Sequence, residues 1–123
     1  MKKKSSEIVI LSRGAVSVSN VAAEDNKQAG IAINNQNAYS DQPVSVTNSH
    51  FYMNDAGGIV VNSRGAITLT NVSAAENVGY GAYLDNRAGT GLTGVIIRST
   101  VAAVYYDFGR NTNDGIDIYT DGA

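Results

Sequence analysis

The chain has 123 residues, a net charge of −2 and no cysteine. This length suits one domain, and the lack of cysteine excludes disulfides, thiolate metal sites and a cysteine nucleophile. The only basic run is Lys2 to Lys4, so no nucleic-acid surface is expected. No stretch reaches the roughly 18 apolar residues of a membrane span, and the apolar run from Ile8 to Leu11 is too short for a signal peptide core.

Short runs of alternating β-branched residues predict strands along the whole chain. In chain order these runs begin at Ile8, Val16, Ile31, Val44, Ile59, Ile67, Ala82, Val95 and Ile116. A period of two places one side of each strand in a core. The runs fall into two alternating sets, and no stretch has a helical stripe. The chain contains no Asn-Gly pair, so tight hairpins are disfavoured.

The chain repeats itself at long range. Residues 12–26 read SRGAVSVSNVAAEDN and residues 63–77 read SRGAITLTNVSAAEN, an offset of 51 residues. Within this repeat, the strands that begin at Val16, Val44, Ile67 and Val95 follow one another at long, short and long intervals. These intervals of roughly 23 to 28 residues are the size of one coil of a β-solenoid. Each repeat unit therefore holds two coils.

We therefore predict one solenoid domain over residues 1–123. Residues 1–6 are expected to be flexible or a weak cap, and residues 12–62 form the first two-coil repeat. Residues 63–123 form a second, degenerate repeat, with a six-residue insertion expected near 106–113.

Equivalent positions of successive coils should stack in ladders along the solenoid. Asparagine in a corner tolerates left-handed backbone, and stacked amides can bond to one another. Glycine at the opposite corner is expected to supply a positive φ. The predicted ladders are Asn20, Asn48 and Asn71, then Asn26, Asn54 and Asn77, then Gly30, Gly58, Gly81 and Gly115. A column of inward residues is expected at Ala23, Phe51, Ala74 and Ala102.

The segments ITLTNVSAAENVGYGAYLDN at 67–86 and VSVTNSHFYMNDAGGIVV at 44–61 resemble the right-handed parallel β-helix repeats of bacterial secreted and surface proteins, the pectate-lyase-like solenoid superfamily. The resemblance covers nearly the whole chain and weakens after Arg98. It implies an all-β, right-handed parallel β-helix of about four to five coils, located outside the cell or on its surface. It implies no particular activity, because one fold carries many functions.

One motif is similar to a catalytic signature of that superfamily. NTNDGIDI at 111–118 resembles the NTDGID motif of pectin-hydrolysing β-helix enzymes, with one extra residue, and Asp114 or Asp117 would be the matching carboxylate. The later GDD, GHG and RIK motifs of those enzymes have no counterpart here. The alternative, which we favour, is a turn that leads into a strand. We predict no catalytic residue, no cofactor and no metal site.

Other candidates are weaker. The single histidine, His50, has no partner in its column, and the acidic corner of Glu24, Asp25 and Glu76 is either a weak cation site or a solvated edge. The Ser/Thr residues that face outward on one strand set resemble an ice-binding array but suit any exposed strand. Tyr105, Tyr106 and Phe108 lie where the chain departs most from its repeat. They form either a glycan- or protein-binding loop or an irregular coil that folds its aromatics inward.

A solenoid without caps leaves its ends open, and neither end of this sequence resembles a cap. The leading hypothesis is a non-catalytic extracellular module, either a stalk or adhesin segment of a longer chain or a subunit that stacks head to tail into a fibre. The near-integral number of coils permits such stacking. The alternative is a carbohydrate-active or carbohydrate-binding domain, with surface glycans as partners.

Overall fold

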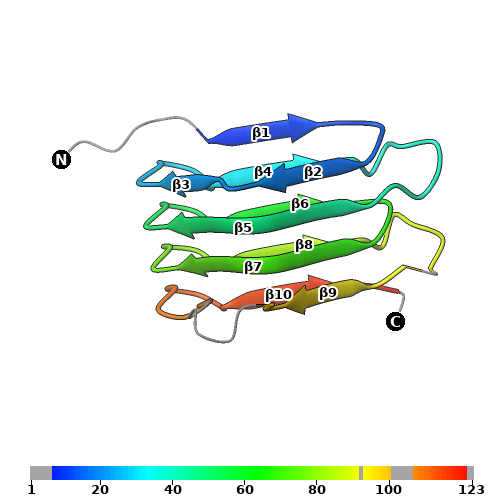
Figure 1. The fold of residues 1–123 in the computed structure, drawn as a ribbon. Coiled ribbons are helices and arrows are strands. Elements are labelled where there is room, and N and C mark those ends of the chain that lie inside the picture. Colours follow the sequence, from blue (N-terminus) through cyan, green and yellow to red (C-terminus); the bar gives the residue numbers. More distant parts are fainter. Residues whose placement is uncertain (1–6, 92, 101–106, 122–123) are drawn as a thin grey trace.

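The computed structural model describes residues 7–91, 93–100 and 107–121, and these form an all-β coil without helices. Ten strands follow one another around the coil (Figure 1). They are β1 (Ile8–Leu11), β2 (Val16–Ser19), β3 (Ala22–Glu24), β4 (Ile31–Asn34), β5 (Val44–Tyr52), β6 (Ile59–Asn62), β7 (Ile67–Ala75), β8 (Ala82–Asp85), β9 (Val95–Arg98) and β10 (Ile116–Tyr119).

The strands form two parallel sheets on opposite sides of the coil, as the sequence predicted. One sheet has the order β1-β4-β6-β8-β10 and the other has the order β2-β5-β7-β9. We call these the first sheet and the second sheet. Val16 pairs with Val44, Val44 with Ile67 and Ile67 with Val95, so the predicted alternation of long, short and long coils is confirmed.

The alternating residues of both sheets meet in one narrow core. Ile31, Ile59 and Ile67 are completely buried, whereas the residue that follows each of them is only partly buried. Period-two patterning therefore sets which side of each strand is buried. Burial of one such aliphatic side chain contributes about 1.5–3 kcal/mol, so the stacked rows supply most of the driving force for folding.

The second sheet continues beyond its predicted strands onto a third face. β3 pairs with the second half of β5, which pairs in turn with the second half of β7. The inward column here contains Ala23, Phe51 and Ala74, as predicted. Phe108 follows Ala74 in this column, because the backbone N–H of Ala74 bonds to the carbonyl of Asp107, the residue before Phe108. Ala102, which was expected there, lies outside the described residues. Small and large residues thus alternate along the column.

The registers also correct the position of the insertion. Thr100 still contacts Asn71, 29 residues earlier, whereas Asp107 already contacts Ser73, 34 residues earlier. The extra residues therefore lie between Thr100 and Asp107, and not near 106–113. The segment 107–119 is regular coil, which explains why the NTNDGIDI motif aligns with NVGYGAYL of the coil before it.

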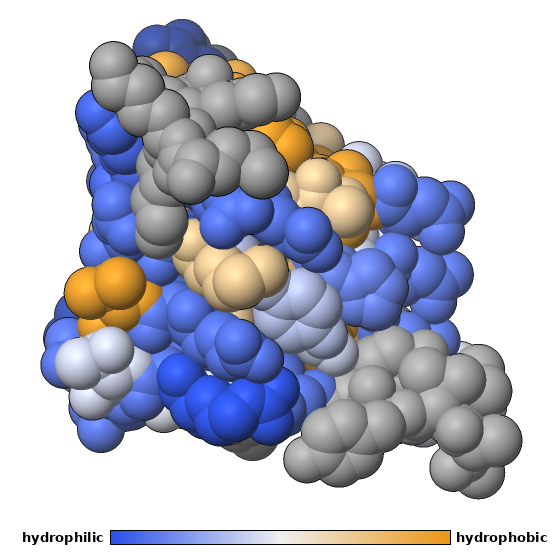
Figure 2. All heavy atoms as spheres, turned by 90° about the vertical axis from the view of Figure 1, so that its left-hand side faces the viewer, coloured by the Kyte–Doolittle hydropathy of each residue, from blue (hydrophilic) through white to orange (hydrophobic). Residues whose placement is uncertain are grey.

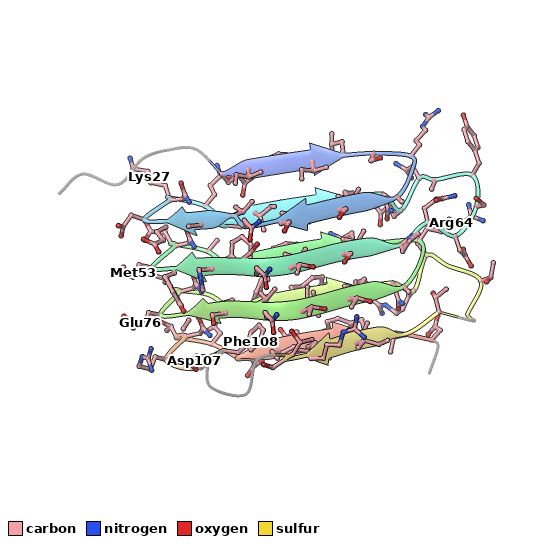
Figure 3. All side chains as sticks on the ribbon, viewed as in Figure 1. Lys27, Met53, Arg64, Glu76, Asp107 and Phe108 are labelled. Carbon is pink, nitrogen blue, oxygen red and sulfur yellow. The ribbon has the colours of Figure 1, made fainter. Side chains whose placement is uncertain are left out.

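Two rows of left-handed residues form the corners of the third face. Asn20, Asn48 and Asn71 have φ of 58°, 52° and 56°, as predicted for corner asparagines. The second row was not predicted, because it consists of unlike residues. It contains Asp25, Met53, Glu76 and Arg110, with φ of 54–58°, and Figure 3 shows Met53 above Glu76 at the same edge of the coil.

The asparagine ladder that follows this second row is confirmed and is longer than predicted. Nδ2 of Asn26 donates to Oδ1 of Asn54 at 2.9 Å, Asn54 donates to Asn77 at 3.0 Å, and Asn77 donates to Asn111 at 3.0 Å. Asn54 and Asn77 also donate to carbonyls of the preceding coil. The amides therefore link four successive coils through hydrogen bonds that are buried between Asn54 and Asn77 and partly buried at the two ends of the ladder, where Asn111 of the supposed catalytic motif is a member.

The glycine ladder is present, but the predicted reason for it was wrong. Gly30, Gly58, Gly81 and Gly115 are not among the described glycines with positive φ. A Cβ on Gly58 would lie 2.6 Å from the carbonyl oxygen of Gly81 and 2.8 Å from the Cβ of Ala74. Adjacent coils approach too closely here for any side chain, so crowding rather than backbone conformation requires glycine.

The opposite edge of the coil explains why the repeat has two unlike coils. In the short connections, Oγ of Ser12 and Ser63 accepts the N–H of the glycine two residues later, at 3.0 Å. In the long connections, the buried Nδ2 of Asn35 donates to the carbonyl of Gln42, and that of Asn86 donates to the carbonyl of Thr93. Serine closes a tight turn, whereas asparagine spans a longer loop.

The two long loops are tied together across the intervening coil. Oδ2 of Asp41 accepts bonds from the N–H and the hydroxyl of Thr90, and its Oδ1 lies 3.4 Å from Nε of Arg64. The pKa of Asp41 is lowered, chiefly by the Thr90 hydroxyl and also by Arg64. Arg64 points toward this loop at the edge of the coil in Figure 3.

Candidate functional site

A row of tyrosines lies on the outer face of β8 and β10. The ring of Tyr83 is 5.6 Å from that of Tyr80 and 5.3 Å from that of Tyr119, with interplanar angles of 39° and 41°. Tyr83 and Tyr119 project outward from adjacent strands, and Tyr119 is 41% exposed. Burial raises the pKa of Tyr83, and the nearby Asp85 raises it further. We call Tyr80, Tyr83 and Tyr119 the tyrosine row.

An arginine extends this aromatic surface. The guanidinium of Arg87 lies 4.8 Å from the ring centroid of Tyr119 and binds both carboxylate oxygens of Asp85, at 3.1 and 2.7 Å. The hydrogen bond from Arg87 lowers the pKa of Asp85. A bidentate partner and a ring beneath it hold the guanidinium flat against the surface.

Asp114 and Asp117 lie beside the tyrosine row. They occupy, one coil later, the positions equivalent to Tyr80 and Tyr83. Asp117 is aligned with Tyr83 across the β8–β10 pair. Its pKa is raised, first by burial and then by the charge of Asp114 and a hydrogen bond with it. The charge of Asp114 therefore disfavours the ionised form of Asp117.

The predicted aromatic loop is only partly described. Tyr105 and Tyr106 lie outside the described residues. Phe108 is half-buried and packs against the core. Figure 3 shows it beside Asp107 in the lowest coil. Its position agrees with a coil that folds this aromatic inward.

Two of the remaining polar candidates, His50 and Glu76, have structural partners. The ring of His50 stacks on Tyr52 at 5.9 Å, and Glu76 pairs with Arg110 at 3.0 Å. Within residues 7–91, 93–100 and 107–121, no cluster of three acidic or histidine side chains suits a metal ion. The outward Ser/Thr rows end at Ile96 and at Arg98, whose Nε donates to Thr70. Figure 2 shows the edge of the coil that carries Met53 and Glu76, and the turns there are mainly hydrophilic, with small separate apolar spots.

A shallow cleft of about 280 Å³ lies at the opposite edge, near the start of the coil. Leu11, Arg13 and Asn34 line it together with Ser12 and Asn37. Arg13 donates to the Tyr39 hydroxyl at 2.7 Å and lies over its ring. The cleft has no buried charged group, so its geometry indicates no particular chemistry.

Both ends of the coil expose residues that are buried elsewhere. Ile8 is 39% exposed and Ile118 is 46% exposed, although both occupy inward columns. The buried Oδ1 of Asn86 has no hydrogen-bond partner among the described residues, whereas the same atom of Asn35 accepts the N–H of Arg64. The terminal layers thus lack contacts that the interior layers make. The structure offers no helix, in the residues it describes, with the length and hydropathy to cross a bilayer.

Sequence reasoning missed the tyrosine row. Tyr80 and Tyr83 were visible as outward or turn residues, but the pairing of Tyr119 with Asp85 depends on the longer offset of the last coil. That offset was obscured by the misplaced insertion. The signal available in the sequence was the recurrence of tyrosine at 80, 83 and 119 beside charged residues.

Parallel sheets, coils of two alternating lengths and internal amide ladders define a parallel β-solenoid. A comparison with protein families matches residues 2–122 to the right-handed beta helix region, and the chain belongs to this family. The handedness expected from the resemblance is therefore confirmed. Searches among curated proteins and solved structures gave no match.

Proposed function

We propose that this chain is a non-catalytic structural module of an extracellular bacterial β-helix protein. It serves as a stalk or adhesin segment or as a fibre subunit that stacks head to tail. The observation that carries this proposal is the contrast between a fully bonded interior and two open terminal layers. Ile8 and Ile118 are exposed at the ends, while Ile31 and Leu84 of the same columns are buried.

The recurrent polar residues support a structural role because they are already used within the coil. The side chains of Asn54 and Asn77 are buried and bonded on both sides. Ser63, Asn35 and Asn86 hold the connections. Side chains that bond to neighbouring coils are not free to bind a ligand.

The layers favour continuation within a chain over simple stacking. Each sheet has five strands among the described residues, but β2 and β3 both pair with β5 and share one layer, so the second sheet has four layers against five in the first. In a head-to-tail stack, β10 of one copy would meet β1 of the next, while β9 and β2 would stay one strand apart. A stalk segment avoids that gap because adjoining chain supplies the missing strand.

Electron microscopy and light scattering over a range of concentrations test the fibre form. Filaments are expected to disappear on Ile118→Lys, which puts a charge in the exposed inward position of the last strand. Val78→Lys is the matched control, because Val78 is 51% exposed in a turn away from the ends. Equal loss of filaments in both variants would argue against end-to-end contact.

A carbohydrate-binding or carbohydrate-active surface is the second candidate, and the tyrosine row favours it. Partly exposed rings beside carboxylates and a guanidinium are groups that contact sugars. Hydrolysis is less favoured than binding, because Asn111 of the NTNDGIDI motif is a member of the structural amide ladder. Release of reducing sugar from pectin-like polymers, abolished by Asp117→Asn, would establish the enzyme. Retention on such polymers that Tyr119→Ala removes would establish binding.

A further inference from the structure

The tyrosine row joins rings that belong to different coils. The ring centroids of Tyr83 on β8 and Tyr119 on β10 lie 5.3 Å apart, and those of Tyr80 and Tyr83, within one coil, lie 5.6 Å apart. β8 and β10 are neighbouring parallel strands (Figure 1). In the described part of the chain, these are the only tyrosine pairs with ring contact.

The two neighbours of Tyr83 differ in their freedom to move. A Cβ on Gly57 would lie 2.6 Å from the ring of Tyr80, so that ring is packed against the backbone of the coil before it. Tyr119 is 41% exposed, and an exposed side chain changes its torsion angles rapidly. Tyr119 is therefore the neighbour that can bring a ring edge against Tyr83.

A carboxylate beside Tyr83 can take its phenolic proton. Burial and the nearby Asp85 raise the pKa of Tyr83, and Arg87 holds the two carboxylate oxygens of Asp85 at 3.1 and 2.7 Å. A phenol that loses an electron becomes a strong acid, so its proton passes to a base within reach. Asp85 therefore makes Tyr83 a phenol from which an electron and a proton can leave together.

We propose that Tyr83 and Tyr119 form a site of oxidative cross-linking, at which hydrogen peroxide and a haem peroxidase join the two rings as dityrosine. The oxidant removes one electron and one proton from each phenol, and the two radicals form a carbon–carbon bond between positions ortho to the oxygens. The hydrogen on each bonded ring carbon then moves to the phenolic oxygen, so both hydroxyls are restored. The two electrons and two protons reduce the peroxide to two water molecules.

The product ties two coils together covalently, which a chain without cysteine cannot do by a disulfide. The bond falls where one amide ladder changes, because the amide of Asn71 donates to Thr100 at 2.8 Å rather than to another asparagine. A cross-link between distant residues stabilises a fold by restricting the unfolded chain. The inference goes beyond the proposed function and rests on it only for a location outside the cell, where peroxide and peroxidases can reach the chain.

Peroxidase and peroxide treatment of the purified chain at micromolar concentration tests the inference. Trypsin cuts after Arg64, Arg87 and Arg110, so Tyr83 and Tyr119 fall in separate peptides, residues 65–87 and 111–123. We expect mass spectrometry of the monomer band to find these two peptides joined with the loss of two hydrogen atoms. The treated chain should also unfold at a higher urea concentration than the untreated chain.

Three phenylalanine variants separate this site from general oxidation of tyrosine. Tyr83→Phe and Tyr119→Phe should each lose the joined peptides and the shift of the urea midpoint. Tyr39→Phe is the matched control and should keep both, because Tyr39 is 81% exposed and contacts Arg13 rather than a second tyrosine. Circular dichroism checks that each variant keeps its strands.

Joined peptides in the unmodified chain and in Tyr39→Phe, with their loss in the other two variants, support the inference. Products that form mainly through other tyrosines, a link confined to peptide 65–87, or no dityrosine at all would each overturn it. The filament and polymer assays judge the proposed function without an oxidant, so failure of the cross-link leaves that function standing.

Discussion

The asparagine ladder allows a quantitative prediction. Oδ1 of Asn54 accepts bonds from the N–H and Nδ2 of Asn26, at 3.1 and 2.9 Å, and its Nδ2 donates to Ala23 and Asn77, at 3.1 and 3.0 Å. Asn54→Ala removes all of these bonds at a completely buried position. At about 1 kcal/mol for each bond, the free energy of unfolding should fall by about 4 kcal/mol. That is a large part of the roughly 5–15 kcal/mol of a typical domain.

Urea unfolding followed by circular dichroism measures this loss. Asn26→Ala is the matched control, because its half-buried side chain makes one ladder bond, to Asn54, and its loss should cost about 1 kcal/mol. The double variant Asn54→Ala/Asn77→Ala should lose less than the sum of its single variants, since the two residues share bonds. Equal losses for Asn54→Ala and Asn26→Ala would refute the view that buried amides hold the coils together.

Three further predictions concern crowding, the core and protonation. Gly58→Ala should destabilise the fold by about 1–3 kcal/mol in urea unfolding because its Cβ meets the next coil, whereas Gly14→Ala, with 3.9 Å to the nearest atom, should be nearly neutral. Phe51→Ala should cost about 3–5 kcal/mol, and a loss below about 1 kcal/mol would contradict the packed column. Carboxyl NMR should find the pKa of Asp117 above its ordinary value of 3.8. The stability that Asp117 contributes is then fully present below pH 3.8 and is lost as the pH rises through the raised pKa. Asp114→Asn should lower the pKa of Asp117, and an unchanged titration would contradict the pairing.

Much of the fold was predictable because stacking repeats residue types at fixed offsets. Pairing of like residues predicts the strands of the two main faces, the coil lengths and the Asn26 to Asn77 ladder. The role of Gly58 was misjudged, since a sequence records that a side chain is absent but not whether backbone angle or a neighbouring coil forbids it. The close carbonyl of Gly81 decides this.

The prediction failed in the segment where the residues of the repeat do not recur. Between Arg98 and Asn111, Ala102 and Phe108 are both apolar, and either could have filled the column after Ala74. Backbone bonding at Asp107 selects Phe108. The longer offset that results also aligns Tyr119 with Asp85, and thus creates a surface that no single segment reveals.

The fibre form of the proposed function holds that the exposed ends of this structural coil are association surfaces. Sedimentation velocity of the unmodified chain, from micromolar to millimolar concentration, tests it most directly. The account predicts an average mass that rises above that of one chain as concentration increases, with no rise at the same concentrations when Ile8→Lys and Ile118→Lys charge both exposed ends. A mass that stays at one chain throughout this range would contradict it.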